Sequence, residues 1–264
     1  MELPLYKLDA FTDRVFAGNP AAVCPLEAWL PEAVMQAIAA ENNLSETAFL
    51  VPNGKGYAIR WFTPVCEADL CGHATLASAH VICTRLRPEL DEIAFESASG
   101  PLRVVRQGES YTLDFPAQPG RRLGDRDALT AVAAALGREP SEVWRASKSM
   151  AVLASEAAVA AVAPDMAKVA ALPSDGLIVT APGSAVDFVS RYFAPAAGIP
   201  EDPVTGSAHC TLTPYWAERL GKPRLSARQI SARGGALTVE LKGERVLITG
   251  RVTPYLEGRI HVPG

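Results

Sequence analysis

One pattern occurs twice in the 264-residue chain, about half a chain length apart, and it constrains the fold more than any other feature. Residues 60–74 and residues 191–208 both begin with Arg, an aromatic residue, Phe, a small residue and Pro. After a short insertion in the second copy, further positions align: Glu67 with Glu201, Cys71 with Thr205, Gly72 with Gly206, and His73 with Ser207. Self-similarity of this kind predicts two lobes built from one repeated unit.

The boundary between the expected lobes falls near the middle of the chain. The segment Pro116–Arg122, Pro-Ala-Gln-Pro-Gly-Arg-Arg, has the composition of a linker. We therefore expect an N-terminal lobe over residues 1–118 and a C-terminal lobe over residues 119–250. The final strand, residues 251–264, is expected to return to the first lobe, because the second already has enough strands.

Alternating apolar and polar residues indicate many short strands, and longer apolar stripes indicate a few helices. Strands are expected at Lys7–Phe11, Thr47–Val51, Tyr57–Phe62, Glu92–Glu96, Leu102–Arg106, Tyr111–Phe115, Gly176–Thr180, Asp187–Phe193, Ser226–Ser231, Leu237–Leu241 and Val246–Thr249. Helices are expected at Pro31–Asn42, Gly72–Leu86, Asp127–Leu136 and Gly206–Leu220. The helix after the first motif is apolar nearly all round and therefore requires burial. The pattern predicts an α+β chain in which an antiparallel sheet wraps around an apolar helix, twice.

Composition limits the partners. The chain is 48% hydrophobic and 20% charged, with a net charge of −4, so it can bury a substantial core and offers no basic footprint for nucleic acid or an anionic membrane. We expect a small-molecule ligand. The first residues lack a signal-peptide pattern and the five cysteines lack a disulfide framework spacing, which together predict a cytoplasmic protein with reduced thiols.

The starts of the two motif helices are candidate anion sites. A helix that begins at Gly72 or Gly206 presents backbone N–H groups without intrahelical partners and the positive end of the helix dipole. If the repeat brings both starts to one crevice, they face the same small anion, so phosphate, sulfate or carboxylate is expected near Gly72–His73 or Gly206–Ser207. The simpler interpretation, in which each glycine only makes a tight turn, suits either one alone.

Two rival sites use the cysteines. Cys66, Cys71, His73, His80, Cys83, His209 and Cys210 are enough ligands for zinc. Their spacing argues against a metal, because Cys-x4-Cys-x-His is not a usual pairing and His80 and Cys83 lie on the apolar helix. Cys71 at a helix start is also a candidate nucleophile. No second thiol matches it, because Thr205 occupies the corresponding position.

Four motifs resemble those of the PhzF-like isomerases of phenazine biosynthesis. They are Gly18-Asn19-Pro20, Leu44-Ser45-Glu46-Thr47-Ala48-Phe49, Cys71-Gly72-His73-Ala74-Thr75 and Glu201-Asp202-Pro203-Val204-Thr205-Gly206-Ser207-Ala208, in the order of that family. The resemblance implies the diaminopimelate-epimerase fold, with two pseudo-symmetric lobes, each a barrel-like, mostly antiparallel sheet around a central helix. It also implies an active site in the cleft between the lobes, no cofactor and a homodimer.

The resemblance assigns roles to particular residues. Glu46 matches the catalytic acid/base, and His73, Asp202 and Ser207 match residues that line the site and hold or help protonate the substrate. Asn19, Gly72 and Gly206 are the further candidates for binding substrate. A carboxyl group in a partly dry cleft has a raised pKa and can both give and take a proton, so one group suffices.

Three functions remain open at this point. The first is a cofactor-independent isomerase that moves a proton within a small carboxylate-bearing substrate, which in the phenazine enzymes is a dihydro-hydroxyanthranilate. The second is an amino-acid epimerase or racemase that uses Cys71. The third is a small-anion binding protein without turnover, which the presence of Glu46, His73 and Asp202 disfavours.

Overall fold

The computed structural model describes residues 1–262, and these divide into two compact units. Unit 1 comprises Met1–Asp114 and the chain from Ile248 onward, and unit 2 comprises Phe115–Leu247. The segment expected to be a linker therefore lies within unit 2, where Arg121–Arg122 forms a short strand. None of the helices in the described residues combines the length and the apolar character needed to cross a bilayer.

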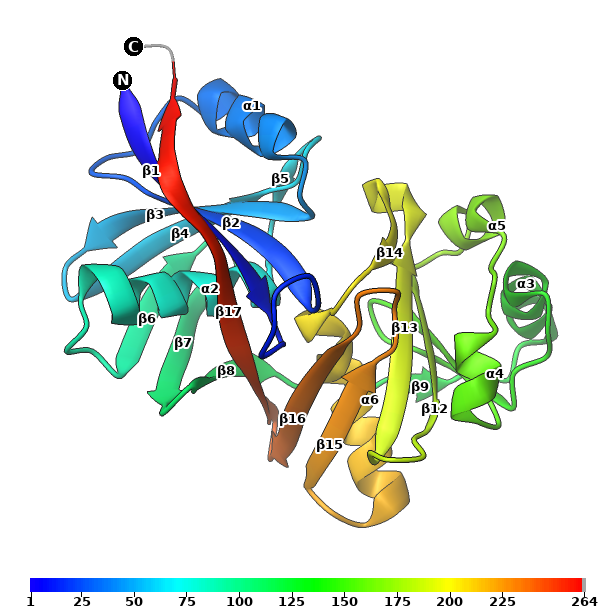
Figure 1. Cartoon of the computed structure of the whole chain (residues 1–264). Helices are drawn as coiled ribbons and strands as arrows, with labels where there is room; N and C mark the ends of the chain where they lie inside the picture. Colours follow the sequence, from blue (N-terminus) through cyan, green and yellow to red (C-terminus); the bar gives the residue numbers. More distant parts are fainter. Residues whose placement is uncertain (263–264) are drawn as a thin grey trace. The chain divides into compact units, whose positions relative to one another are not determined.

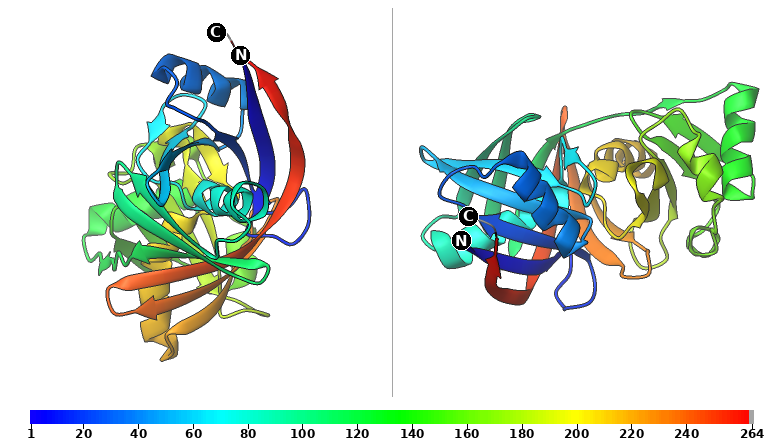
Figure 2. Two further views of the ribbon diagram at one scale, coloured as in Figure 1. Left: turned by 90° about the vertical axis from the view of Figure 1, so that its left-hand side faces the viewer. Right: turned by 90° about the horizontal axis from the view of Figure 1, so that it is seen from above.

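Unit 1 is a closed barrel of eight strands (Figures 1 and 2). The barrel strands are β1 (Glu2–Ala10), β2 (Asn19–Pro25), β3 (Glu46–Asn53), β4 (Gly56–Phe62), β6 (Glu92–Ser97), β7 (Gly100–Gln107), β8 (Ser110–Pro116) and β17 (Arg245–His261). They pair around the ring in the order β17, β1, β2, β3, β4, β6, β7, β8 and back to β17. The pairs β2–β3 and β4–β6 are parallel and the others with a described register are antiparallel.

Helix α2 (Gly72–Val81) occupies the inside of this barrel (Figure 2). Each of its residues is buried except His80, which is half-buried, as expected for a helix that is apolar all round. The helix that the sequence predicts to run unbroken to Leu86 changes at Ile82 into a π-helical turn, η1 (Ile82–Leu86). Barrel strands such as β6 alternate buried and exposed residues, so one face of each strand packs inward.

Two further elements complete unit 1. Helix α1 (Glu32–Asn42) packs Met35 and Ile38 against Phe49 and Phe62 of the barrel. It ends at Asn43, whose left-handed backbone (φ 48°) caps the helix with a bond from its N–H to the carbonyl of Ala39. The short strand β5 (Glu67–Ala68) pairs with the end of β4. The chain ends of the described region meet, since the amino group of Met1 donates to the carbonyl of Val262 at 2.7 Å.

Unit 2 has the same kinds of elements. Its strands are β9 (Arg121–Arg122), β10 (Glu142–Arg145), β11 (Ser149–Val152), β12 (Leu177–Pro182), β13 (Phe188–Ala194), β14 (Ile199–Asp202), β15 (Arg224–Gln229) and β16 (Gly235–Lys242). Its helices are α3 (Arg126–Leu136), α4 (Glu156–Ala160), α5 (Met166–Ala170), the 3-10 turn η2 (Pro195–Ala197) and α6 (Gly206–Leu220). The pairs β11–β12 and β13–β15 are parallel and the other described pairs are antiparallel.

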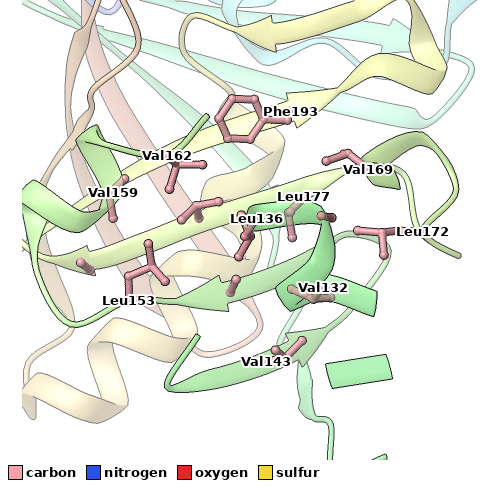
Figure 3. Packing of buried hydrophobic residues seen from close by; sticks show 14 of the residues in the cluster. Val132, Leu136, Val143, Leu153, Val159, Val162, Val169, Leu172, Leu177 and Phe193 are labelled. Atoms are coloured by element: carbon pink, nitrogen blue, oxygen red, sulfur yellow. The ribbon is translucent and has the colours of Figure 1, made fainter. Parts of the chain in front are cut away.

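The sheet of unit 2 separates two layers of helix. Leu177 and Val179 of β12 join an apolar cluster with α3, α4 and α5 on one face (Figure 3). Thr180 points to the other face, where its Oγ1 accepts a hydrogen bond from the indole Nε1 of Trp216 in α6 at 3.0 Å. Alternate residues of β12 thus contact the outer helices on one face and the central helix α6 on the other.

The repeated pattern has matching geometry in both units. Arg60 forms a two-bond ion pair with Glu67, with Nε–Oε1 2.6 Å and Nη2–Oε2 2.5 Å. Arg191 does the same with Glu201, at 2.7 and 2.9 Å. The residues before the two helices, Cys71 and Thr205, are both extended, with φ of −135° and −109°. The repeat predicted from the sequence is therefore a repeat of structure.

Candidate active site

Three elements of unit 1 bring a carboxylate, an imidazole and an amide together. Asn19 is the first residue of β2 and Glu46 the first of β3, and these parallel strands pair with Ala21 opposite Glu46. His73 is the second residue of α2. Its Nδ1 lies 3.1 Å from Asn19 Nδ2, and its Nε2 lies 3.3 Å from Glu46 Oε2. Residues separated by more than fifty positions thus form one cluster at the start of the central helix.

The protonation of His73 follows from its surroundings. Burial lowers the pKa of His73 to about 3, and the carbonyl of Pro20 opposes this shift only in part, so the ring is neutral near pH 7. The amide Nδ2 of Asn19 can only donate, so Nδ1 of His73 accepts. The proton of the neutral ring is then on Nε2, which faces Glu46. His73 presents an N–H group to this carboxyl and does not act there as a charged acid.

Glu46 lies at the rim of this buried cluster. Its side chain is 13% exposed, whereas that of His73 is 4% exposed. The 3.3 Å contact between Oε2 and Nε2 is within ion-pair distance but does not meet the angular criteria of a hydrogen bond. The carboxyl group is therefore held beside a donor and is still within reach of a small molecule.

Cys71 is the fourth member of the cluster. It is buried, and its Sγ lies 3.5 Å from Nδ1 of His73. Together, Glu46, Cys71 and His73 place one donor atom each within 4.8 Å of one another, so they could hold a metal ion. Such an ion would have to displace the proton from Nε2, because Asn19 already occupies Nδ1. Cys71 and His73 belong to the residues that the sequence analysis weighed for zinc and disfavoured, and Glu46 is the addition.

The other cysteines and histidines of that set in unit 1 have different surroundings. Cys66 is exposed and contacts the hydroxyl of Thr63. His80 packs edge-on against the ring of Tyr111, with centroids 5.5 Å apart. Cys83 is buried, and burial raises its pKa to about 11, which keeps the thiol neutral. His80 and Cys83 therefore have packing roles, and Cys66 lies at the surface.

Unit 2 carries a different polar cluster at the corresponding helix start. Asp202 ends β14, and its Oδ2 accepts a hydrogen bond of 2.5 Å from the hydroxyl of Thr205. Gln229, at the end of β15, donates from Nε2 to the carbonyl of Asp202 at 2.7 Å and accepts from the N–H of Thr205 at 2.9 Å. The network fixes the segment that leads into α6, where Gly206 and Ser207 are the first residues.

The residues expected from the sequence therefore fall into two groups. Asn19, Glu46, Gly72 and His73 gather in unit 1, and Asp202, Gly206 and Ser207 gather in unit 2. Gln229 was not predicted. Its only signal in the sequence is a polar residue at an inward position of a strand whose other inward residues, Leu225 and Ala227, are apolar.

A barrel closed around a buried helix, together with a second unit that repeats the ion pair and the helix start, defines the two-lobed α+β class with the diaminopimelate-epimerase fold. Within that class, the chain belongs to the phenazine biosynthesis-like protein family (PhzC-PhzF), whose model matches residues 8–258.

Similar proteins agree with this assignment over the full length of the chain. A Pseudomonas aeruginosa protein named as an uncharacterized isomerase is 50% identical over 262 residues, which cover 99% of this chain and 100% of the relative. The crystal structure of a PhzF family protein from Enterococcus faecalis matches with a TM-score of 0.95 at 50% identity, covering 99% and 100%. A hydroxyproline epimerase from Agrobacterium vitis shares the fold alone, with a TM-score of 0.62, 13% identity and coverage of 98% and 92%.

Proposed function

We propose that this protein is a cofactor-independent isomerase that moves a proton within a small carboxylate-bearing substrate, with Glu46 as the acid/base group. The observation that carries the proposal is the contact between Glu46 and the neutral ring of His73 at the rim of a buried helix start. The isomerase names of family relatives agree with this reaction class.

The chemistry requires only one proton carrier. Ionised Glu46 removes a proton from one carbon of the substrate, and the electron pair of that C–H bond shifts into the adjoining π system. Protonated Glu46 then returns the proton to a different carbon, which restores the carboxylate. The N–H of His73 faces Oε2 and stabilises the ionised form, while Asn19 keeps the imidazole in the tautomer that can do so.

The other predicted residues would hold the substrate. Gly72 and Gly206 begin helices whose first N–H groups suit an anion, and Ser207 adds a hydroxyl. Asp202 is already hydrogen-bonded to Thr205, which favours an orienting role over that of a second proton carrier. The cleft location of the reaction, the homodimer and the cytoplasmic compartment stay predictions of the family resemblance and the sequence.

A second candidate is an epimerase that uses the thiol of Cys71. The 3.5 Å contact between Sγ and Nδ1 of His73 favours it, because an imidazole could accept the thiol proton. The repeat opposes it, because the matching residue is Thr205, whose hydroxyl donates to Asp202. A two-thiol mechanism therefore lacks its second base.

The experiment is incubation of the protein with dihydro-hydroxyanthranilate in heavy water, followed by NMR. The proposal expects deuterium at carbon in the product together with a shift of a double bond. A product that differs only in configuration at one carbon would support the epimerase instead. Binding without exchange or conversion, across this compound and other small unsaturated carboxylates, would support the binding protein.

A further inference from the structure

Unit 2 contains a buried lysine to which neither the sequence motifs nor the comparisons assign a role. Lys148 directly precedes β11 and is only 9% exposed. Its Nζ lies 5.8 Å from the centre of the Tyr192 ring. Within residues 1–262, Nζ has neither a hydrogen-bond nor an ion-pair partner. A largely buried lysine without a counter-ion is unusual, because removing a charge from water is costly unless the charge is paired.

The surroundings of Lys148 place it at the helix start of unit 2. Tyr192 lies directly opposite Asp202 in the β13–β14 pair, and residues directly opposite in such a pair point to the same face. Asp202 is hydrogen-bonded to Thr205, the residue before α6. The ring that faces Lys148 and the carboxylate that fixes the start of α6 therefore share one side of the sheet.

The repeat supports the same placement. Trp61 aligns with Tyr192 in the repeated pattern, and their strand partners are Ala48 and Ile178. Glu46 lies two residues before Ala48 on β3, and Gly176 lies two residues before Ile178 on β12. The position of Glu46 in unit 1 therefore corresponds to that of Gly176 in unit 2. The parallel neighbour of Glu46 is Ala21, and continuing the β11–β12 register by one residue puts Lys148 beside Gly176. Unit 2 has a cation next to the position where unit 1 has its carboxyl group.

The charges near Lys148 do not fully offset the cost of burying its ammonium group. Burial lowers the pKa of Lys148, while the charges of Asp175, Cys210 and Asp202 oppose this only in part. A carboxylate bound here would supply the missing counter-ion.

We propose that Lys148 binds the carboxylate group of the substrate at the start of α6. The proposal rests on the proposed function for the substrate class. It assigns carboxylate recognition to Lys148 of unit 2.

The test compares two probes that differ only by the carboxylate, 3-hydroxyanthranilate and 2-aminophenol. Their affinities are measured by calorimetry for the parent protein, Lys148→Met and Lys148→Arg. The parent is expected to bind the acid at least about tenfold more tightly, as charge-assisted hydrogen bonds typically provide. Lys148→Met should lose most of the preference for the acid, with the affinity for 2-aminophenol unchanged. Lys148→Arg should keep part of the preference.

A matched control is Lys168→Met, which removes an exposed lysine of the same unit that pairs with Asp165. It should leave the preference intact. The proposal is overturned if the parent shows no preference, if Lys148→Met keeps it, or if Lys148→Met loses affinity for both probes alike, which would indicate a structural role. Lys148→Gln provides a second neutral variant, and thermal melting establishes that each variant is folded.

Failure of this proposal is distinguishable from failure of the proposed function. If the parent catalyses deuterium exchange but Lys148→Met retains the carboxylate preference, only the role of Lys148 is wrong. If the preference depends on Lys148 but the parent exchanges no deuterium into any substrate tried, the carboxylate site stands and the isomerase assignment fails.

Discussion

The two helix starts have the same framework and different chemistry. Each follows a paired Arg and Glu, Arg60 with Glu67 and Arg191 with Glu201, and each begins with glycine after an extended residue. At α2 the side chains are Glu46, His73, Asn19 and Cys71, with the imidazole next to the carboxyl. At α6 they are Asp202, Thr205 and Gln229, all linked by hydrogen bonds, with Lys148 nearby.

Under the proposed function, this difference separates the shared framework of the two units from the side chains that would take part in the reaction. The ion pairs and the extended residue before each helix are present in both copies. The groups that can transfer a proton differ between the copies, since Gly176 stands where unit 1 has Glu46. We therefore expect substitutions in unit 1 to affect turnover and substitutions in unit 2 to affect substrate binding.

The largest effect is expected at Glu46. Glu46→Gln keeps the shape of the side chain but removes the transferable proton, so turnover should fall by about 10²–10⁴-fold or more while ligand affinity is retained. Glu46→Asp keeps the carboxyl group but withdraws it by one methylene and should lose about 10²-fold. Product formation by NMR gives the rates, and calorimetry with 3-hydroxyanthranilate gives the affinities. Equal losses of affinity and rate would contradict the assignment.

Intermediate effects are expected at His73 and Asp202. His73→Ala removes the N–H that faces Glu46, and Asp202→Asn removes the charge beside Thr205, so each disturbs positioning without removing the proton carrier. Both should lower kcat/KM by up to about 10²-fold. The comparison predicts that His73→Ala acts mainly on kcat and Asp202→Asn mainly on KM. If His73→Ala instead changed mainly KM and Asp202→Asn mainly kcat, the proposed difference between the two units would be wrong.

A smaller effect concerns pH and the buried histidine of α6. Burial lowers the pKa of His209 to about 4, opposed in part by the carbonyl of Thr205, which lies 2.8 Å from its Nδ1. Between pH 6.5 and 4 the unfolded chain binds a proton at His209 that the folded protein does not, so stability falls as the pH falls. The expected contribution is about 1.4 kcal/mol per pH unit below 6.5.

His209→Gln removes this contribution and should flatten the pH dependence of urea unfolding between pH 7 and pH 5. His261→Gln, which replaces an exposed histidine, is the matched control. A variant at His209 with the same slope as the parent would show that this histidine is protonated in the folded state.

The smallest effect is expected from a chelator. Although Glu46, Cys71 and His73 could hold an ion, the proposed reaction uses the carboxyl group and the neutral ring without one. Prolonged treatment with EDTA should leave the exchange rate within the error of the assay. A loss of rate that zinc restores would replace the proton-transfer account of unit 1 with a metal site.

Periodic and repeated features of the sequence predicted much of the fold. The α6 helix was predicted with both ends correct, because an apolar stripe begins at Gly206 and Gly221 provides the left-handed C-cap (φ 65°). The segments β2, β10, β11 and β14 were not predicted as strands. They are short or contain proline, as in Asn19-Pro20, and only pairing with distant neighbours makes them strands.

The candidate site was predictable only where residues are close in sequence or belong to a family motif. Glu46 resembles an ordinary surface residue until β3 pairs with β2 and faces α2. Lys148 and Gln229 belong to no motif, and their burial follows from the folding of segments far apart in the chain. The expectation that both helix starts face one anion concerns the relation of the two units and stays a prediction.

The central claim is that the carboxyl group of Glu46, and not the thiol of Cys71, carries the proton. Deuterium incorporation from heavy water into dihydro-hydroxyanthranilate, compared between Glu46→Gln and Cys71→Ala under identical conditions, tests it most directly. We predict that Glu46→Gln abolishes incorporation and that Cys71→Ala retains it within about tenfold of the parent, since in the proposed reaction the thiol contacts the ring of His73 and carries no proton to the substrate. Incorporation by Glu46→Gln at the parental rate, together with an inactive Cys71→Ala, would contradict the claim and assign proton transfer to the thiol.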